Sequence, residues 1–303
     1  MGKLVNLGSL CIDHVYSVPD ITGPGETVAS LGHEVFPGGK GLNQSVAAAR
    51  AGAEVMHVGC VGEDGAWLKE VLAEAGVAAS GVRVAAGASG HAVIQVNAAG
   101  ENAIVIAGGT NRELAEADVT TALDALAPDD WLLLQNEIND LEGVLAAASR
   151  RGARVAFNVA PVDGREAGYD LSDIALLIVN EIEAAALAGE GDPPKALESL
   201  CQRYPNMDVV LTLGREGLLC ASPDGTRAMP AYPVQAVDET AAGDAFIGYL
   251  MAALLAGDEI SPALRKASAA GALAVTKAGA ASSIPTPEDV KALLASVGAP
   301  ERG

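Results

Sequence analysis

Short apolar runs rich in β-branched residues alternate along this chain with longer alanine-rich stretches of helical character. Trp131–Leu134 is followed by Leu141–Arg150, and Leu176–Val179 is followed by Glu181–Ala188. Runs of four or five apolar residues have the length of buried strands, and the stretches between them have the length of helices. Repeated strand–helix units favour a mostly parallel sheet covered by helices on both faces. We therefore expect an α/β fold with the layers of a three-layer sandwich.

The full set of expected elements follows from the same pattern. The apolar runs predict strands at Lys3–Leu7, Glu54–Val58, Val93–Asn97, Ala103–Ile106, Trp131–Leu134, Arg154–Phe157, Leu176–Val179, Asp208–Thr212 and Leu218–Ala221. The longer stretches predict helices at Leu42–Arg50, Ala66–Glu74, Leu141–Arg150, Glu181–Ala188, Pro194–Tyr204, Asp244–Ala256, Ser261–Lys277 and Pro287–Ser296. No repeat or linker divides the chain, so we expect a single domain over residues 1–303.

Two regions interrupt the alternation. Asp13–Pro37 lacks helical periodicity and contains Pro19 and Pro24, and Gly90–Ala107 has two apolar runs around a polar turn. Both are typical of hairpins. We expect 13–37 and 90–107 to form a small antiparallel sheet that stands off the main sheet as a lid over a pocket.

The charge of the chain excludes some partners. Its 303 residues include 19 Lys and Arg against 39 Asp and Glu, a formal net charge of −20. Such a surface repels phosphate backbones and anionic lipid, so we expect no nucleic-acid partner and no membrane partner. The acids are scattered, which fits either a salt-rich cytoplasm or an ordinary acidic enzyme.

The cysteines and the apolar runs indicate a cytoplasmic protein. Cys11, Cys60, Cys201 and Cys220 are widely spaced and form no Cys-x-x-Cys pair, which argues against a disulfide scaffold and a zinc finger. Every apolar run ends well short of a membrane span.

The stretch Asp238–Phe246 carries the strongest chemical signal. The small residues Ala241, Ala242 and Gly243 lead into Asp244, after which a long apolar helix begins. The free N–H groups of a helix N-terminus attract phosphate oxygens. A carboxylate beside them can accept the proton of an attacking hydroxyl, which phosphoryl transfer to an alcohol requires. The alternative is that Asp244 only caps its helix, because Asp is among the best N-caps.

A second candidate is the glycine-rich turn Gly38-Gly39-Lys40-Gly41 before Leu42, Asn43 and Gln44. Glycine allows close backbone approach to a ligand, and Lys40 and Asn43 offer donors to hydroxyls or phosphate. The spacing is not that of a Walker A loop. The alternative is a turn that merely begins a helix.

Two further motifs follow predicted strands, where open parallel sheets bind ligands. They are Asn180 with Glu183, and Thr212 to Gly217. Asn180 and Glu183 offer oxygen ligands for a hydrated magnesium ion, and the alternative is a first-turn Glu favoured by the helix dipole. The four histidines show no metal-binding spacing, and we expect them to be ordinary loop or edge residues.

Taken in their order along the chain, these motifs resemble the ribokinase family of sugar kinases. The order is Gly8-Ser9 with Asp13, the turn 38–43, Asn180 with Glu183, Thr212-Leu213-Gly214 with Gly217, and Ala241-Ala242-Gly243-Asp244. The resemblance runs from Val5 to Pro285. It is closest to the ribose-phosphorylating members, through residues 38–44, 235–238 and 274–280.

The resemblance implies a sheet between helices with a β lid that often serves as a dimer interface, so we expect a homodimer. It implies that Asp244 is the base, that Ala241, Ala242 and Gly243 belong to the catalytic set beside it, and that the backbone N–H groups from Ala242 to Asp244 form the anion hole. The residues that would hold the sugar are Asp13, Gly39, Lys40, Gly41, Asn43, Glu137 and Asp244. Those that would bind ATP are Asn180, Thr212, Leu213, Gly214, Gly217, Gly243 and Ser268.

The resemblance also implies two metal ions. Glu183 would organise magnesium through water. A monovalent cation, expected to be potassium, would lie beside the anion hole at Asp238, Thr240, Ala274, Lys277, Gly279 and Ser283.

Three departures from the family pattern bear on the substrate. Cys11 stands where an Asn is common two residues before the sugar-binding Asp, Glu239 replaces a usual Thr, and Ser268 replaces a His or Asn beside the adenine. A thiol cannot make the hydrogen bonds of an amide, and an unmade polar contact changes specificity strongly.

The sequence therefore predicts an ATP-dependent carbohydrate kinase acting on the primary hydroxyl of a pentose, with D-ribose giving ribose 5-phosphate. The alternatives within this chemistry are a nucleoside such as pseudouridine, fructose or 2-keto-3-deoxygluconate. A non-catalytic sugar- or nucleotide-binding protein is a remote alternative.

Overall fold

The computed structural model describes residues 2–223 and 225–296, in which two β-sheets are present. The main sheet has nine strands in the order β13-β12-β11-β10-β9-β8-β1-β4-β5. They are β1 Leu4–Leu7, β4 Val55–Gly62, β5 Ala78–Ala85, β8 Trp131–Gln135, β9 Arg154–Asn158, β10 Ile174–Asn180, β11 Asp208–Thr212, β12 Leu218–Ser222 and β13 Gly225–Met229. Neighbouring strands from β11 to β5 are parallel, whereas β12 and β13 join antiparallel at one edge.

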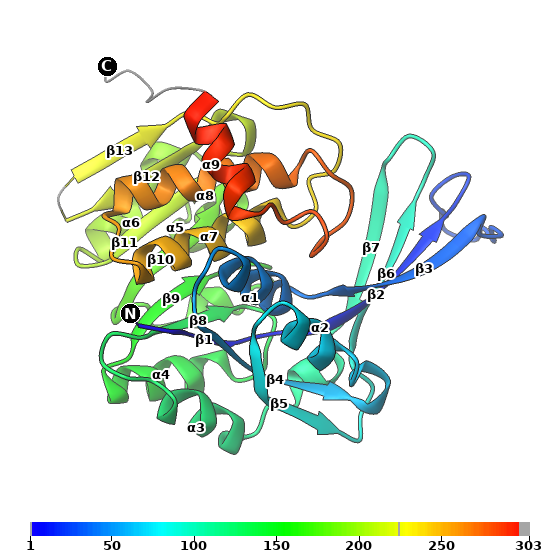
Figure 1. Cartoon of the computed structure of the whole chain (residues 1–303), viewed down its shortest axis with the longest axis horizontal. Coiled ribbons are helices and arrows are strands. Elements are labelled where there is room, and N and C mark those ends of the chain that lie inside the picture. The colour runs from blue at the N-terminus through cyan, green and yellow to red at the C-terminus, as the bar shows by residue number, and fades with distance from the viewer. Residues whose placement is uncertain (1, 224, 297–303) are drawn as a thin grey trace.

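Helices cover both faces of the main sheet (Figure 1). One face carries α1 Lys40–Arg50, α2 Leu68–Glu74, α7 Ala242–Leu255, α8 Ile260–Ala274 and α9 Pro287–Ser296, and the other carries α3 Glu116–Asp124, α4 Leu141–Arg151, α5 Glu181–Ala188 and α6 Pro193–Arg203. Alternate residues of the strands feed the two cores, as Leu133 and Leu132 show. This alternation follows from the two-residue period of a strand. The predicted α/β sandwich is confirmed.

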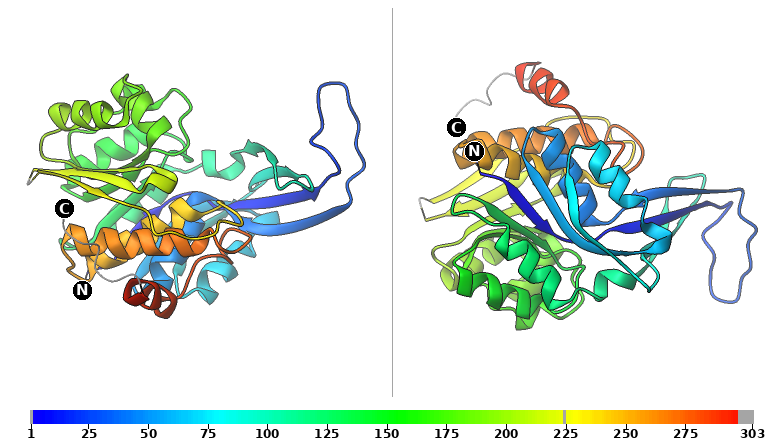
Figure 2. Two further views of the ribbon diagram at one scale, coloured as in Figure 1. Left: turned by 90° about the horizontal axis from the view of Figure 1, so that it is seen from above. Right: turned by 60° about the horizontal axis from the view of Figure 1, so that its bottom comes forward.

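The second sheet, here called the lid, has the strand order β3-β2-β6-β7. Its strands are β2 Cys11–Ser17, β3 Gly32–Gly38, β6 Gly90–Val96 and β7 Asn102–Ala107. Figure 1 and Figure 2 show that it projects from one side of the main body, and the β2–β3 connection reaches farthest.

The expectation of a purely antiparallel lid is wrong. β2 pairs with β6 in parallel, while β2–β3 and β6–β7 are antiparallel hairpins. β2 and β6 are parallel because the main-sheet strands that lead into them are parallel. β1 leads into β2 and β5 leads into β6, and β1 and β5 run in the same direction in the main sheet.

The sequence pattern missed three elements, and three of the four histidines expected in loops or at edges lie on inner strands: His14 on β2, His57 on β4 and His91 on β6. β5, β13 and α3 were not expected, because two are edge strands with weak alternation and α3 contains β-branched residues. His57 was expected in a loop or at an edge, yet it lies on β4 and is fully buried. Among the described residues, no helix combines the length and apolarity needed to cross a membrane.

Candidate active site

Polar side chains stand at the carboxyl ends of successive parallel strands. Asn6 is near the end of β1, while Gln135, Asn158, Asn180 and Thr212 end β8, β9, β10 and β11. The pairing register sets Gln135 opposite Asn158 and Asn180 opposite Thr212. These residues therefore form a continuous polar row at the edge where parallel sheets bind ligands.

Asp244 lies in the first turn of α7, and its carboxylate does not cap the helix. The cap residue is Ala241, in a left-handed conformation with φ 58°, and no side chain caps this helix end. A non-glycine residue in that conformation is strained, and such residues gather at functional sites. The capping alternative for Asp244 is therefore excluded.

The N–H of Ala242, expected in the anion hole, donates to the carbonyl of Glu239 at 3.3 Å. A Cβ at Gly243 would meet no atom within 4 Å, which leaves room beside its N–H.

Two amide side chains of α1 hold the Asp244 carboxylate. Asn43 Nδ2 donates to Oδ2 at 3.0 Å, and Gln44 Nε2 donates to Oδ1 at 2.9 Å. All three side chains are buried. Each carboxylate oxygen therefore has one amide donor, which fixes the plane of the carboxylate. Asn43 was predicted to bind the sugar; one N–H of its amide is used on Asp244, and its buried Oδ1 has no partner.

The glycine-rich turn brings the lid against the start of α1. Gly39 has φ 92° and precedes Lys40, the first residue of α1. A Cβ at Gly38 would overlap the Asp13 carboxylate, so a side chain at Gly38 would displace Asp13. Glu137, which follows β8, accepts hydrogen bonds from the Ser9 hydroxyl and from the backbone N–H of Lys40.

Charges converge on this turn. Burial lowers the pKa of Lys40, but the carboxylates of Asp244, Glu137 and Glu183 more than offset it, and the net effect is a raised pKa. Burial, together with Glu137 and Asp244, raises the pKa of Asp13 to about 6. Three acids thus surround one ammonium group, which leaves Lys40 charged and facing an otherwise negative site.

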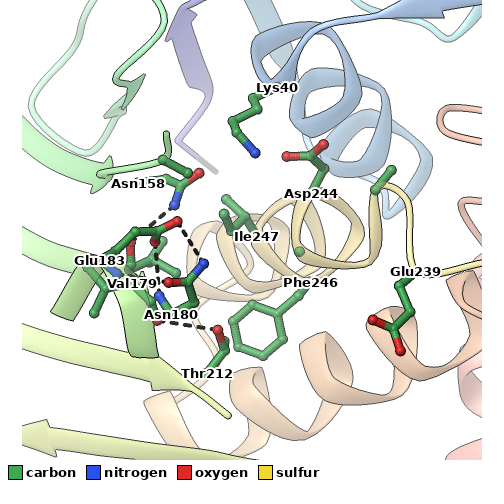
Figure 3. Close-up of a pocket in the computed structure, with 14 residues that line it drawn as sticks. Lys40, Asn158, Val179, Asn180, Glu183, Thr212, Glu239, Asp244, Phe246 and Ile247 are labelled. Carbon is green, nitrogen blue, oxygen red and sulfur yellow. Dashed lines mark hydrogen bonds between the residues drawn. The ribbon is translucent and has the colours of Figure 1, made fainter. Parts of the chain in front are cut away.

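A cavity opens beside Asp244 (Figure 3). It is lined by Lys40, Asn158, Ala160, Ile178, Val179, Asn180, Glu183, Thr212, Glu239, Ala241, Gly243, Asp244, Phe246 and Ile247. Lys40 and Asp244 lie at one end in Figure 3, with Asn180, Glu183 and Thr212 across from them. The cavity therefore joins the strand-end motifs to the N-terminus of α7. The other residues predicted to hold the sugar do not line it: Asp13, Gly39, Gly41, Asn43 and Glu137.

Asn180 and Glu183 form a capping box at the start of α5. Asn180 Oδ1 accepts from the N–H of Glu183, and both Glu183 oxygens accept from Asn180, each at 2.9 Å. Glu183 therefore has the structural role considered for it, because it stabilises the first turn of α5. Burial raises the pKa of Glu183, although the Asn180 backbone N–H and Lys40 act in the opposite direction. Among the described residues, no cluster of three or more His, Cys, Asp or Glu side chains is arranged to hold a metal ion.

The other predicted nucleotide residues lie around the end of β11. Leu213 donates its N–H to the carbonyl of Gly217, closing a turn around Gly214. Ser268 lies on α8, outside the cavity lining, and its hydroxyl contacts the sulfur of Met229 at 3.9 Å.

Asp238 joins the two loops that carry most of the predicted cation residues, and Ala274 is the last residue of α8. Asp238 Oδ1 accepts from the N–H of Thr240 at 2.9 Å and its Oδ2 from the N–H of Gly279 at 2.8 Å. Lys277 N–H donates to the Ala274 carbonyl, and the Ser283 hydroxyl donates to the Ala280 carbonyl. Burial raises the pKa of Asp238, but these backbone donors and Thr240 give a net lowering.

Sequence reasoning missed several polar residues of the site. Gln44, Gln135, Asn158 and Asn6 are buried and connected to Asp244, and Asn111 holds Cys11. A signal existed for Gln135 and Asn158, since each is the first polar residue after an apolar strand run. The departure at Cys11 is a buried thiol whose sulfur accepts from Asn111 Nδ2 at 3.4 Å.

The fold and the site together define a class of protein. It is a kinase in which a carboxylate and a helix N-terminus lie at the C-terminal ends of parallel strands, beside a β lid. The chain belongs to the pfkB family of carbohydrate kinases, whose family profile matches residues 1–287, and it is a carbohydrate kinase.

Relatives of known name agree with this class. The chain is 39% identical to the ribokinase of Haemophilus influenzae, over 96% of this chain and 98% of that protein. It is 32% identical to the deoxyribokinase of Salmonella typhi, over 95% of this chain and 97% of that protein. It superposes on the structure of Arabidopsis thaliana ribokinase complexed with ribose and ATP with a TM-score of 0.82 and 28% identity, covering 97% of this chain and 99% of that chain.

Proposed function

We propose that this kinase transfers the γ-phosphoryl group of ATP to the primary hydroxyl of D-ribose, giving ribose 5-phosphate and ADP. One observation carries the proposal: the Asp244 carboxylate is held by two neutral amides in the first turn of α7, at the end of a cavity. The relatives support the substrates, because one is complexed with ribose and ATP and another is named ribokinase.

The sugar is proposed to lie between the lid and Asp244. Asp13 and Glu137 are acceptors for its hydroxyls, and Lys40 balances their charge. The buried, unpartnered Oδ1 of Asn43 is a further acceptor next to the base. A buried polar atom without a partner is costly, and a ligand hydroxyl would satisfy it.

ATP is proposed to occupy the cavity on the other side of Asp244. Its phosphates would lie against the N–H groups of Gly243 and Asp244, while Thr212 and the turn Leu213-Gly214 to Gly217 would lie toward the base. Ser268 would be the family's adenine-flanking position, and its small side chain offers no stacking surface.

The reaction then needs one base and one anion site. Asp244 accepts the proton of the sugar hydroxyl as its oxygen attacks the γ-phosphorus, and the bond to the ADP oxygen breaks. The helix N–H groups and Lys40 stabilise negative charge on the transferring group.

Two cations accompany this proposal. Oxygen donors suit magnesium, and Glu183 is the cavity carboxylate that would orient its water, since both of its oxygens are already fixed by Asn180. Bound with ATP, magnesium would neutralise phosphate charge. A potassium ion would be held by backbone carbonyls of the loops that Asp238 joins, with Thr240, Ala274, Lys277, Gly279 and Ser283 at its margin.

Cys11 supports a second acceptor, 2-deoxy-D-ribose. A thiol is a weak hydrogen-bond partner, so an acceptor that lacks one hydroxyl loses little at Cys11. The deoxyribokinase relative agrees with this alternative.

The lid is proposed to pair with a second copy of the chain. One face of the lid exposes Val105 of β7, Val93 of β6 and Val35 of β3. The other face exposes Ile104 and Ile106 of β7 and Phe36 of β3. Exposed apolar side chains gathered on a sheet in this way are typical of an interface between protein chains.

The testing experiment measures ADP formed from magnesium-ATP with D-ribose, 2-deoxy-D-ribose, pseudouridine, fructose and 2-keto-3-deoxygluconate, each with and without potassium. The proposal expects ribose to have the highest kcat/KM and potassium to increase it. A higher kcat/KM for 2-deoxyribose assigns the chain to the second acceptor. No turnover with either pentose overturns the proposed substrate.

A further inference from the structure

We infer that Gln44 is a positioning residue for the reaction, which fixes the orientation of the Asp244 carboxylate from beneath. The inference rests on the proposed function, in which Asp244 is the base. Gln44 is fully buried on α1 and lies outside the cavity lining, so it does not reach the substrates. Its Nε2 donates to Asp244 Oδ1 at 2.9 Å and to Asn158 Oδ1 at 3.2 Å.

The neighbours of Gln44 allow only one orientation of its amide. Gln44 Oε1 accepts from Gln135 Nε2 at 2.8 Å, and the same Nε2 donates to Asn6 Oδ1 at 3.0 Å. If the Gln44 amide were flipped, its oxygen would face the Asp244 carboxylate and its N–H₂ would face another N–H₂. Both contacts would be repulsive, so the donor is locked onto Asp244.

The chain of hydrogen bonds continues to a histidine that sets its direction. Asn6 Nδ2 donates to Ser45 Oγ, which is 2.8 Å from His57 Nδ1, and His57 Nε2 faces the Gly8 carbonyl at 3.3 Å. Burial lowers the pKa of His57 to about 4, so the ring is neutral at pH 7. With its single proton directed at Gly8, His57 accepts from Ser45, and Ser45 accepts from Asn6. Each donor in the series thus has one consistent direction.

This arrangement has a specific effect on the base. Gln44 and Asn43 each donate to one oxygen of Asp244, which fixes the plane of the carboxylate. The charged groups that also act on Asp244 are Lys40 on α1, Asp13 on β2 and Glu183 on α5. They remain in place when Gln44 changes, so a change at Gln44 removes its hydrogen bonds to Asp244, Asn158 and Gln135 without removing a charge.

The test replaces Gln44 by Met, which keeps the length and removes the donor. The measured quantity is the rate of phosphoryl transfer in a single turnover, by rapid quench with saturating ribose and magnesium-ATP, from pH 5 to pH 9. We expect the rate in Gln44→Met to fall on the order of tenfold to a hundredfold, because a hydrogen bond to a charged group is lost. The acid limb of its pH profile moves to higher pH, and KM for ribose changes much less.

Ser45→Ala is the matched control, because Ser45 belongs to the same helix and the same hydrogen-bond series but does not contact Asp244. It lowers thermal stability and leaves the acid limb in place. In an Asp244→Asn background, Gln44→Met causes no further loss of rate, since there is no base left to position.

The outcomes separate this inference from the proposed function. If Asp244→Asn retains activity, the role of Asp244 fails. If Asp244→Asn is inactive but folded Gln44→Met keeps the rate within twofold and the acid limb of the parent, the inference on Gln44 is overturned. Should Gln44→Met not fold, Gln44→Glu keeps the size and polarity. It is expected to move the acid limb to higher pH, because two adjacent carboxyls share a proton, and an unmoved limb overturns the inference.

Discussion

The buried floor of the site and the lid above it are built in opposite ways. The floor consists of Asn6, Gln44, Gln135 and Asn158 beneath Asp244, all buried and joined by directed hydrogen bonds. The lid leaves Val105 70% exposed and Ile106 57% exposed. The amide donors of the floor have acceptors within the chain, although the acceptor Gln135 Oε1 has no partner. The lid instead exposes apolar side chains on both of its faces. In the proposed reaction, Asp244 is therefore positioned before any ligand arrives, while covering of the sugar by the lid depends on contacts made later.

This difference has a physical origin. An amide series inside a protein is stable only when each donor has an acceptor, so it admits one arrangement and is rigid. The exposed apolar side chains of the four-stranded lid admit several arrangements, because apolar contacts are not directional. Preorganised charge serves the chemical step, and an adaptable cover serves substrate entry.

The largest effect on turnover is expected from Asp244→Asn, which removes the carboxylate that the floor holds. We expect turnover to fall on the order of a hundredfold or more, because the base is lost. The fold should persist, since the oxygen of the introduced amide can accept from Gln44, and the orphaned Oδ1 of Asn43 can accept from the introduced N–H₂ after an amide flip. Steady-state rates, ATP binding by calorimetry and thermal unfolding check this. A rate near that of the parent would remove Asp244 as the base.

Lowering the pH tests His57, which lies at the far end of the hydrogen-bond series from Asp244. His57 has a folded pKa of about 4 against an ordinary value of 6.5, so the folded protein binds fewer protons between these values than the unfolded chain. Stability is therefore present above pH 6.5 and is lost as pH falls toward 4, by about 2–3 kcal/mol for this residue. Urea unfolding at pH 7.5, 5.5 and 4.5 measures it. His57→Asn should show a smaller decline, and an equal decline contradicts the assignment.

In the lid, Asp13→Asn is expected to weaken sugar binding and to increase stability. We expect KM for the sugar to rise about tenfold, because a charged acceptor is lost. The folded pKa of Asp13 is about 6, above its ordinary 3.8, so its ionised form costs stability above pH 6. Asp13→Asn should therefore be more stable than the parent by about 1 kcal/mol at pH 8 and equal to it below pH 4. Calorimetric titration with the sugar measures the change in affinity, and urea unfolding at both pH values measures the change in stability. Unchanged sugar affinity would place Asp13 outside the site.

The smallest effect on rate is expected from Val105→Asp. A charge on the exposed apolar face of β7 opposes burial against a second lid, so we expect one chain per particle where the parent has two. Light scattering across a range of concentrations measures this, with Val105→Thr as the control of similar shape. A parent that is monomeric at every concentration contradicts the proposed homodimer.

The sequence predicted the sandwich and much of the site edge for local reasons. Asn180 and Thr212 directly end apolar strand runs, and the carboxyl ends of parallel strands meet at one edge, so their proximity follows from topology alone. The same logic extends to Gln135 and Asn158, which end their strands in register. The lid's mixed pairing was missed because it depends on β1 and β5 running in parallel, which neither hairpin encodes.

Local pattern and motif order thus determined the fold class, the lid strands and the helix start at Asp244. Only the tertiary structure decided what holds that carboxylate. Asn43 and Gln44 lie at sequence separations of 201 and 200 from Asp244, and they reach it because α1 and α7 lie on the same face of the sheet. Sequence periodicity reports which residues are buried, but the partner of a buried amide is set by how distant elements pack, and that is a property of the folded chain.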